Sequence, residues 1–194
     1  MDCLRLGRRA EQLGDIGKTV LIGLLGEGLS EEIEGDGNAR RLLVLLTEDQ
    51  RLLLGLIDAA DLPRFAALGV IANLEPLWLC LEPGMTELTL PRLGDRGDAQ
   101  YPLADLIRSG ATVSFGSDWP ISSEVPMAGI ATAVSRQTET GEPPGVWTPW
   151  QRISLAQALN AYSAAVATQA GEAGTWGRIA VGKRADLVLL NADP

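Results

Sequence analysis

The stretch GATVSFGSDWP, residues 110–120, joins an apolar run to an acidic residue. The run from Ala111 to Phe115 is followed by two small residues and then by Asp118. Because an unpaired charge at the end of a buried strand is costly, a carboxylate at such a place usually binds a metal or accepts a proton. Histidine is the most common partner for this chemistry, yet the 194 residues contain none. The stretch therefore predicts a buried strand that ends in an active-site acid or in the remains of one.

The segments around this stretch alternate between apolar strands and capped helices. We expect strands at 18–26, 52–57, 70–77 and 111–118, helices at 58–69, 101–110, 126–138 and 153–171, and a long loop at 78–100. Ser154 is the predicted N-cap of the last helix. Alternation of near-continuous apolar strands with helices predicts an α/β fold with parallel strands and helices outside. About four such units make half of a (β/α)₈ barrel, which leaves two strand edges open.

The chain divides into three predicted segments. Residues 1–17 form an N-terminal extension, 18–172 form the partial barrel, and 173–194 form a β segment of a different character. Glycines punctuate this last segment and predict a hairpin there.

Composition limits the classes of partner and compartment. The net charge of −9 and a pI near 4.5 argue against nucleic acid and anionic membranes as partners. No stretch is apolar enough for a membrane span, and the N-terminus lacks the apolar core of a secretory signal, so we expect a cytoplasmic protein. Cys3 and Cys80 are too few for a disulfide framework and read as reduced thiols.

From about Asp58 onward the sequence resembles the metal-dependent amidohydrolase superfamily, specifically the amidohydrolase-3 type. The segments that carry the resemblance, in the order of the family, are DLPRFAALGVIANLEPLW, RLGDR, YPLADLIRSGATVSFGSDWPISSEVPM, SLAQALNAYS and GRIAVGKRADLVLLNADP. The resemblance implies a TIM-like (β/α)₈ barrel, here about strands 5–8, with a small β-sandwich built from both chain ends. It also implies hydrolysis of amide-like C–N bonds in small molecules with one or two divalent metals, such as zinc.

The resemblance implies a role for Asp118 at the end of the eighth barrel strand. There the family has an acid that helps bind the metal and accepts a proton from the attacking water. A carboxylate suits both tasks. The alternative from the residues alone is that Asp118 caps the following turn or helix, which aspartate does routinely.

Four further residues are candidates for substrate binding. Glu75 and Asn73 would point to one face at the end of the preceding strand, and the alternative for Glu75 is an exposed acid at the edge. Trp78 and Trp119 would line an apolar pocket, and their alternative is packing.

The sequence departs from the family where the metal ligands belong. The histidine-bearing first strand has no counterpart, Gly23 stands at the position of the strand-five histidine, and Leu53 or Leu54 stands at that of strand six. Since a metal site normally takes three or four protein ligands, we expect this chain alone to hold no metal and to be inactive or nearly so.

Two other classes stay open. The first is a catalytically dead binding or interaction module. The second is a truncated or frame-shifted part of a longer hydrolase. Its expected partners are a small-molecule substrate and either a second copy, which would close the barrel edges, or a missing N-terminal half.

Overall fold

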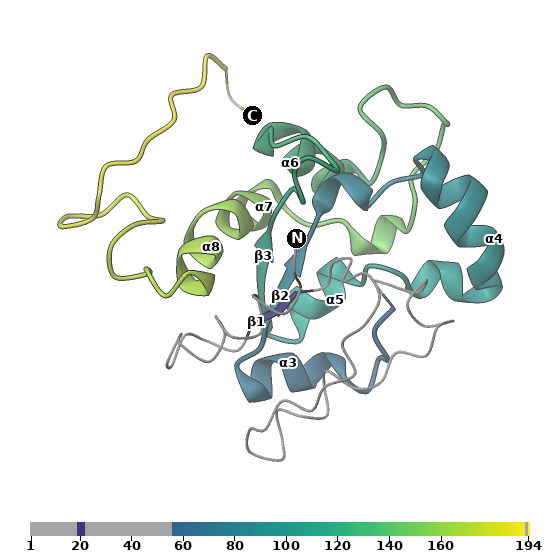
Figure 1. Cartoon of the computed structure of the whole chain (residues 1–194), viewed down its shortest axis with the longest axis horizontal. Helices are drawn as coiled ribbons and strands as arrows, with labels where there is room; N and C mark the ends of the chain where they lie inside the picture. Colours follow the sequence, from purple (N-terminus) through teal and green to yellow (C-terminus); the bar gives the residue numbers. More distant parts are fainter. Residues whose placement is uncertain (1–18, 22–55, 193) are drawn as a thin grey trace, which may run out of the picture.

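The computed structural model describes residues 19–21, 56–192 and 194, and a small parallel sheet lies at its centre (Figure 1). The sheet has three strands, β1 (Thr19–Leu21), β2 (Ile71–Leu74) and β3 (Thr112–Phe115), in the order β1-β2-β3. Asn73 is the partner of Leu21 on one side and of Ser114 on the other. The parallel α/β arrangement that the sequence predicts is therefore confirmed, whereas the partial barrel stays a prediction.

Strands β2 and β3 form where the sequence has its apolar runs. Ala72 and Leu74 of β2, and Val113 and Phe115 of β3, belong to one buried hydrophobic core. The period of two in a strand sends these four side chains to one face, where helices cover them. The opposite face carries Asn73 and Ser114, which are also buried.

Helices pack on both sides of β3. Figure 1 shows α5 (Leu103–Arg108) on one side of the sheet and α7 (Leu155–Tyr162) with α8 (Ala164–Gln169) on the other, and all three contact β3. Helix α3 (Leu62–Leu68) packs against α5 and ends at Gly69, whose φ of 65° closes the helix in the left-handed region. The helices predicted at 58–69 and 101–110 are therefore confirmed with shorter bounds. None of the helices in the described ranges is long and apolar enough to cross a membrane.

The strand predicted at 52–57 is described only at its end. Strand β1 pairs directly with β2, so no strand lies between them. Residues 52–55 are outside the described residues, and Leu56 makes an isolated antiparallel bridge to Gln100 instead. Leucine-rich runs are compatible with several structures, and only the pairing partner decides between them.

The long loop predicted at 78–100 is wrong, because short helical turns occupy much of it. These are η1 (Pro76–Trp78), the π-helical η2 (Gly84–Thr89), α4 (Leu90–Leu93) and the 3₁₀ segment η3 (Gly94–Ala99). Two backbone N–H groups, of Gly84 and Met85, donate to the carboxylate of Glu82 at 2.9 and 2.8 Å, which starts the helical run. Burial of Met85 and Leu93 then holds it on the core.

The predicted helix at 153–171 begins as expected and then breaks. Ser154 caps α7 in a capping box: its Oγ accepts from the backbone N–H of Gln157 at 3.2 Å, and the Gln157 side chain accepts from the backbone N–H of Ser154 at 2.9 Å. The break falls at Ser163, whose φ of −125° and ψ of −86° separate α7 from α8. The predicted cap is confirmed and the single long helix is wrong.

Replacing Ser154 with alanine should lower the free energy of unfolding by about 1 kcal/mol, because one backbone N–H of the first turn loses its acceptor. Chemical denaturation of the wild type and of Ser154→Ala measures this. Thr175→Ala, at an exposed threonine outside the helices, is the control and should change stability by much less. Equal losses in the two variants would contradict the capping role.

The remaining long helix, α6 (Pro126–Ser135), ends at a buried cation. Arg136 follows α6 in the left-handed region with a φ of 59° and is completely buried. Its Nε and Nη2 donate to Trp147 O at 3.3 Å and Thr148 Oγ1 at 2.5 Å, and its guanidinium lies 4.9 Å from the Trp147 ring centre. Arg136 thus ties the end of α6 to the segment before η4 (Pro149–Gln151).

The tail from Ala173 onward forms no strand in its described residues, so the predicted hairpin is wrong. Gly177 anchors the tail: its φ is 91°, and a Cβ there would lie 2.6 Å from the Cβ of Ala167 in α8. Beyond it most apolar side chains face solvent, including Ile179, Val181 and Leu189. Strand formation needs a pairing partner, and the tail finds none in the described part of the chain.

Candidate functional site

Two carboxylates lie beyond the ends of neighbouring strands. Leu74 pairs with Phe115 at the ends of β2 and β3; Glu75 directly follows the first, and Asp118 follows the second after Gly116 and Ser117. The carboxyl ends of parallel strands meet at one edge, so both acids come to the same edge of the sheet. In agreement with this placement, the pKa of Glu75 is raised mainly by burial and also by the negative charge of Asp118.

Glu75 is a buried carboxyl group without a complete set of partners. The residue is 5% exposed, and its Oε2 has no hydrogen-bond partner. Burial raises the pKa of Glu75 from 4.5 to about 7; its own backbone N–H acts in the opposite direction, and the charge of Asp118 raises it further. Glu75 therefore both holds and releases a proton near neutral pH.

Asp118 is exposed and sits in a strained turn. Its φ is 51°, a left-handed value that few residues other than glycine adopt. The backbone carbonyl of Asp118 accepts from Ile121 N at 2.8 Å, whereas none of the hydrogen bonds among the described residues uses its carboxylate. The turn is thus closed by the backbone, and the side chain is left for solvent or a ligand.

Asn73 belongs to a buried network on the sheet rather than to the Asp118 loop. Its Nδ2 donates to Ser114 Oγ at 3.0 Å and to Gln169 Oε1 at 3.2 Å, and Ser114 Oγ donates to Gln169 Oε1 at 2.6 Å. The network joins β2, β3 and the end of α8. These hydrogen bonds occupy the Asn73 amide nitrogen and hold the sheet to the helix.

The two tryptophans differ in their surroundings. Trp78 is half-buried, and its Nε1 donates to Ser122 Oγ at 3.1 Å; Ser122 Oγ in turn donates to Ser117 O at 2.5 Å. Trp78 therefore braces the loop that carries Asp118. Trp119 is 68% exposed and lies directly beside the acid in the sequence.

Two tyrosines that the sequence reasoning missed lie near Glu75. Burial raises the pKa of both Tyr101 and Tyr162 to about 12, and the charge of Glu75 contributes in each case. Tyr162 is on α7 and also packs edge-to-face on Phe115 with ring centres 5.2 Å apart. No local pattern marks these tyrosines, because 26 and 87 residues separate them from Glu75 along the chain.

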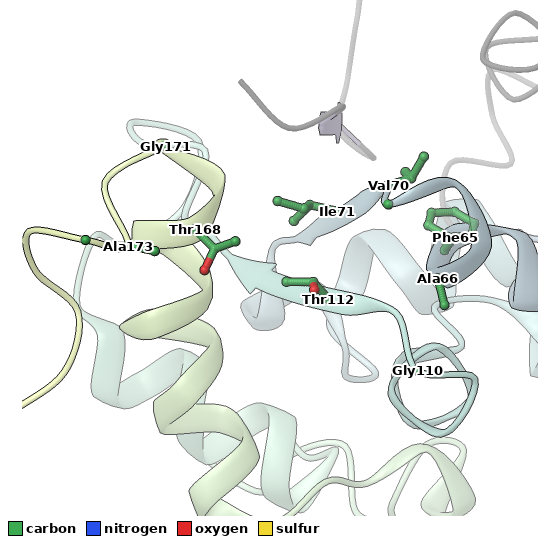
Figure 2. A pocket seen from close by; sticks show the side chains of 11 residues that line it. Phe65, Ala66, Val70, Ile71, Gly110, Thr112, Thr168, Gly171 and Ala173 are labelled. Atoms are coloured by element: carbon green, nitrogen blue, oxygen red, sulfur yellow. The ribbon is translucent and has the colours of Figure 1, made fainter. Parts of the chain in front are cut away.

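A hollow in the described residues lies elsewhere. It has a volume of about 410 Å³ and is lined by Phe65, Ile71, Thr112, Thr168 and other residues from the starts of β2 and β3 and the end of α8 (Figure 2). Its size suits a small ligand. Its lining contains no titratable side chain, so it offers none of the groups that acid–base or metal chemistry requires. We therefore place the candidate site at the carboxylates.

The described residues do not fit a metal ion by themselves. They contain no group of three or more histidine, cysteine, aspartate or glutamate side chains that could hold one, and the whole chain contains no histidine. Catalytic zinc sites normally take three protein ligands. The predicted ligand positions Gly23, Leu53 and Leu54 lie outside the described residues, and none of these residue types has a metal-binding side chain.

Comparison with known proteins identifies the class. Residues 38–194 match the model of the amidohydrolase family, so the chain belongs to that family. This confirms the resemblance seen in the sequence.

Two curated relatives share part of the chain. Protein LONG AFTER FAR-RED 3 of Arabidopsis thaliana is 30% identical over 132 residues, which are 67% of this chain and 22% of the relative. N-substituted formamide deformylase of Arthrobacter pascens is 33% identical over 94 residues, 48% of this chain and 17% of that enzyme. The matches thus span about a fifth of the length of these relatives.

Two solved structures share the fold. Both are uncharacterized metal-dependent hydrolases, from Pyrococcus horikoshii OT3 with a TM-score of 0.60 and from Pyrococcus furiosus with a TM-score of 0.56. Each is 23% identical and aligns with 72% of this chain, but with only 28% and 27% of its own length. The likeness therefore concerns the fold of a part of these hydrolases.

Proposed function

We propose that this chain contributes the carboxylate part of a site that hydrolyses C–N bonds in amide-like small molecules. The observation that supports this most directly is that Glu75 and Asp118 follow the paired ends of β2 and β3, at one edge of the sheet, in a member of the amidohydrolase family. The name of the Arthrobacter pascens relative, a deformylase of N-substituted formamides, agrees with this bond type.

The chemistry of the two acids suits such a reaction. Hydrolysis of an amide adds water to the carbonyl carbon, breaks the C–N bond and needs a proton on the departing nitrogen. Exposed Asp118 would accept the proton that water gives up. Glu75, with a pKa of about 7, is suited to deliver one to the leaving amine.

We also propose that this site is incomplete in the chain alone. Its two carboxylates are fewer than the ligands that a hydrolytic metal takes, and no histidine is available. The missing donors would come from an N-terminal half on another polypeptide or from a second copy of the chain. A binding module without catalytic activity is the second candidate, and the lack of histidine favours it.

Metal content tests the incompleteness. The purified chain is incubated with zinc, passed through a desalting column and analysed by mass spectrometry, with light scattering to record its oligomeric state. We expect far less than one zinc per chain, and no hydrolysis of an N-substituted formamide. One zinc per chain that is lost in Asp118→Asn would overturn the proposal.

A chimera tests the hydrolase function itself. The segment of the Arthrobacter pascens enzyme that aligns with this chain is replaced by the matching residues of this chain, and deformylation is measured. Asp118→Asn in the chimera should reduce the rate by about 100-fold or more, since acid–base groups contribute that much. Glu124→Gln changes an exposed acid six residues away and should leave the rate nearly unchanged. A folded chimera whose rate does not depend on Asp118 would contradict the proposed role.

A further inference from the structure

A hydrogen bond joins the two segments that carry the acids beyond the ends of their strands. Glu75 is the N-cap residue of η1, and Asp118 lies in the Asp118 loop, residues 116–125, between β3 and α6. Trp78 Nε1, at the end of η1, donates to Ser122 Oγ in this loop at 3.1 Å. The pairing of β2 with β3 fixes the two segments where they begin, and this hydrogen bond joins them again further along.

Ser122 uses its hydroxyl in two hydrogen bonds at once. It accepts from the Trp78 indole and donates to Ser117 O at 2.5 Å. Ser117 directly precedes Asp118, so the second hydrogen bond holds the backbone next to the acid. A hydroxyl group can donate one hydrogen bond and accept others, whereas an alanine side chain can do neither. Ser122 therefore connects the indole of one segment to the backbone of the other.

Trp78 is the firmly packed end of this connection. It is half-buried and packs against the hydrophobic core, and η1 also contacts α6. Residues 118–121 of the Asp118 loop, in contrast, are all exposed. A segment with few buried contacts opens easily unless hydrogen bonds hold it. Trp78 is thus the anchor, and the Asp118 loop is the part that is held.

The backbone of Asp118 requires such support. Its φ of 51° is a left-handed value, which residues other than glycine keep where the surrounding structure enforces it. Two hydrogen bonds shape the turn from within: Ile121 N donates to Asp118 O at 2.8 Å, and Trp119 N donates to Ser117 Oγ at 3.3 Å. Both lie inside the Asp118 loop, whereas the hydrogen bonds of Ser122 tie the turn to η1.

We infer that Ser122 is a positioning residue for the proposed reaction: bound to Trp78, it holds the turn in which Asp118 would accept the proton of water. The inference rests on the proposed function, because Ser122 acts on the reaction only through Asp118. A displacement of about 1 Å at a reacting group can lower a rate about 100-fold, so a hydroxyl away from the chemistry can have a large effect.

The order of the Asp118 backbone tests the inference without any catalysis. Order parameters are measured by ¹⁵N relaxation on the purified chain. We expect the Asp118 amide to fall from about 0.85, the value of a rigid backbone, towards about 0.6 in Ser122→Ala and in Trp78→Phe, which removes the indole donor. An Asp118 amide that is equally ordered in the wild type and Ser122→Ala would overturn the inference.

Two matched variants isolate the connection to Trp78. Ser122→Thr keeps the hydroxyl and should keep the order of Asp118. Ser123→Ala removes the neighbouring hydroxyl, which accepts from Val125 N at 3.2 Å within the same loop, and should leave Asp118 unchanged. If Ser123→Ala loosens Asp118 as much as Ser122→Ala does, any hydrogen bond of the loop has this effect, and the inference fails.

Kinetics of the chimera described above test the positioning role itself. Ser122→Ala should lower kcat about tenfold or more and leave KM nearly unchanged, since a misplaced Asp118 affects the chemical step. Ser122→Thr should restore most of the rate. In the Asp118→Asn chimera, Ser122→Ala should cause no further loss, because the group through which it acts is gone. Additive losses in the double variant would overturn the inference.

The outcome is separable from that of the proposed function. An inactive folded chimera, together with an Asp118 amide whose order depends on Ser122, would contradict hydrolysis and leave the control of the turn by Ser122 intact. An active chimera whose rate depends on Asp118 and not on Ser122 would support hydrolysis and reject the positioning role.

Discussion

Replacing Glu75 with glutamine should stabilise the protein at about pH 8 by up to about 3 kcal/mol. A rise of the carboxyl pKa from 4.5 to about 7 corresponds to this energy at about 1.4 kcal/mol for each pH unit. At this pH the ionised carboxylate destabilises the folded state, because it is buried and its Oε2 has no hydrogen-bond partner. Glutamine has nearly the same shape and carries no charge.

The sign of the pH dependence follows from where the proton is bound. Between about pH 4.5 and 7 the folded chain keeps the proton on Glu75, while the unfolded chain has lost it. The contribution of Glu75 to stability is therefore fully present below pH 4.5 and is lost as the pH rises through about 7. The advantage of Glu75→Gln should grow over this window and then stay constant.

Urea denaturation of the wild type and Glu75→Gln across this pH range measures the effect. Glu142→Gln, at an exposed glutamate, is the control and should show no such window. Asp118→Asn should shift the window of Glu75 to lower pH, because one of the causes that raise its pKa is removed. Parallel stability curves for the wild type and Glu75→Gln would contradict the burial of an uncompensated carboxyl group.

The second large effect is expected at Gly129 in α6. A Cβ at this position would lie 2.3 Å from Tyr162 Oη and 2.8 Å from Pro76 Cγ. Alanine in a helix gains about 1 kcal/mol over glycine, but overpacking of a buried contact costs about 1–3 kcal/mol and sometimes more. The contacts are far inside van der Waals distance, so the steric cost wins and Gly129→Ala should be destabilising by about 2 kcal/mol.

A second variant identifies the clash. Tyr162→Phe removes the hydroxyl that makes the shortest contact, so it should recover part of the stability lost in Gly129→Ala in a double-mutant cycle. Gly174→Ala is the matched control, since a Cβ there meets nothing within 4 Å. Additive effects of the two changes would show that α6 and α7 do not approach each other closely at this point.

Local sequence signals predicted the helices and strands whose ends are marked by residues within the element or next to it. The apolar runs gave strands β2 and β3, the proline and glycine at the ends of α3 gave that helix, and Ser154 marked the start of α7. Each of these signals acts within a few residues along the chain, so no tertiary partner is needed to recognise it.

The candidate site was predictable in residue type and only partly in arrangement. Asp118 and Glu75 stand at strand ends, where sequence reasoning finds candidate acids. The raised pKa of Glu75 depends on its burial in the folded chain and on the charge of Asp118, which follows another strand. Asn73 likewise meets Gln169 only because α8 folds back onto the sheet.

The sequence by itself determined that this is an α/β chain of the amidohydrolase family with an acid after a buried strand and without histidine. Only the tertiary structure decided that β1 pairs directly with β2 and that helical turns fill the segment after Trp78. It also decided that the side chain of Glu75 is buried. The physical reason is range. Periodicity and capping act between neighbours in the chain, whereas strand pairing and the pKa of a buried acid depend on groups that meet only when the chain folds.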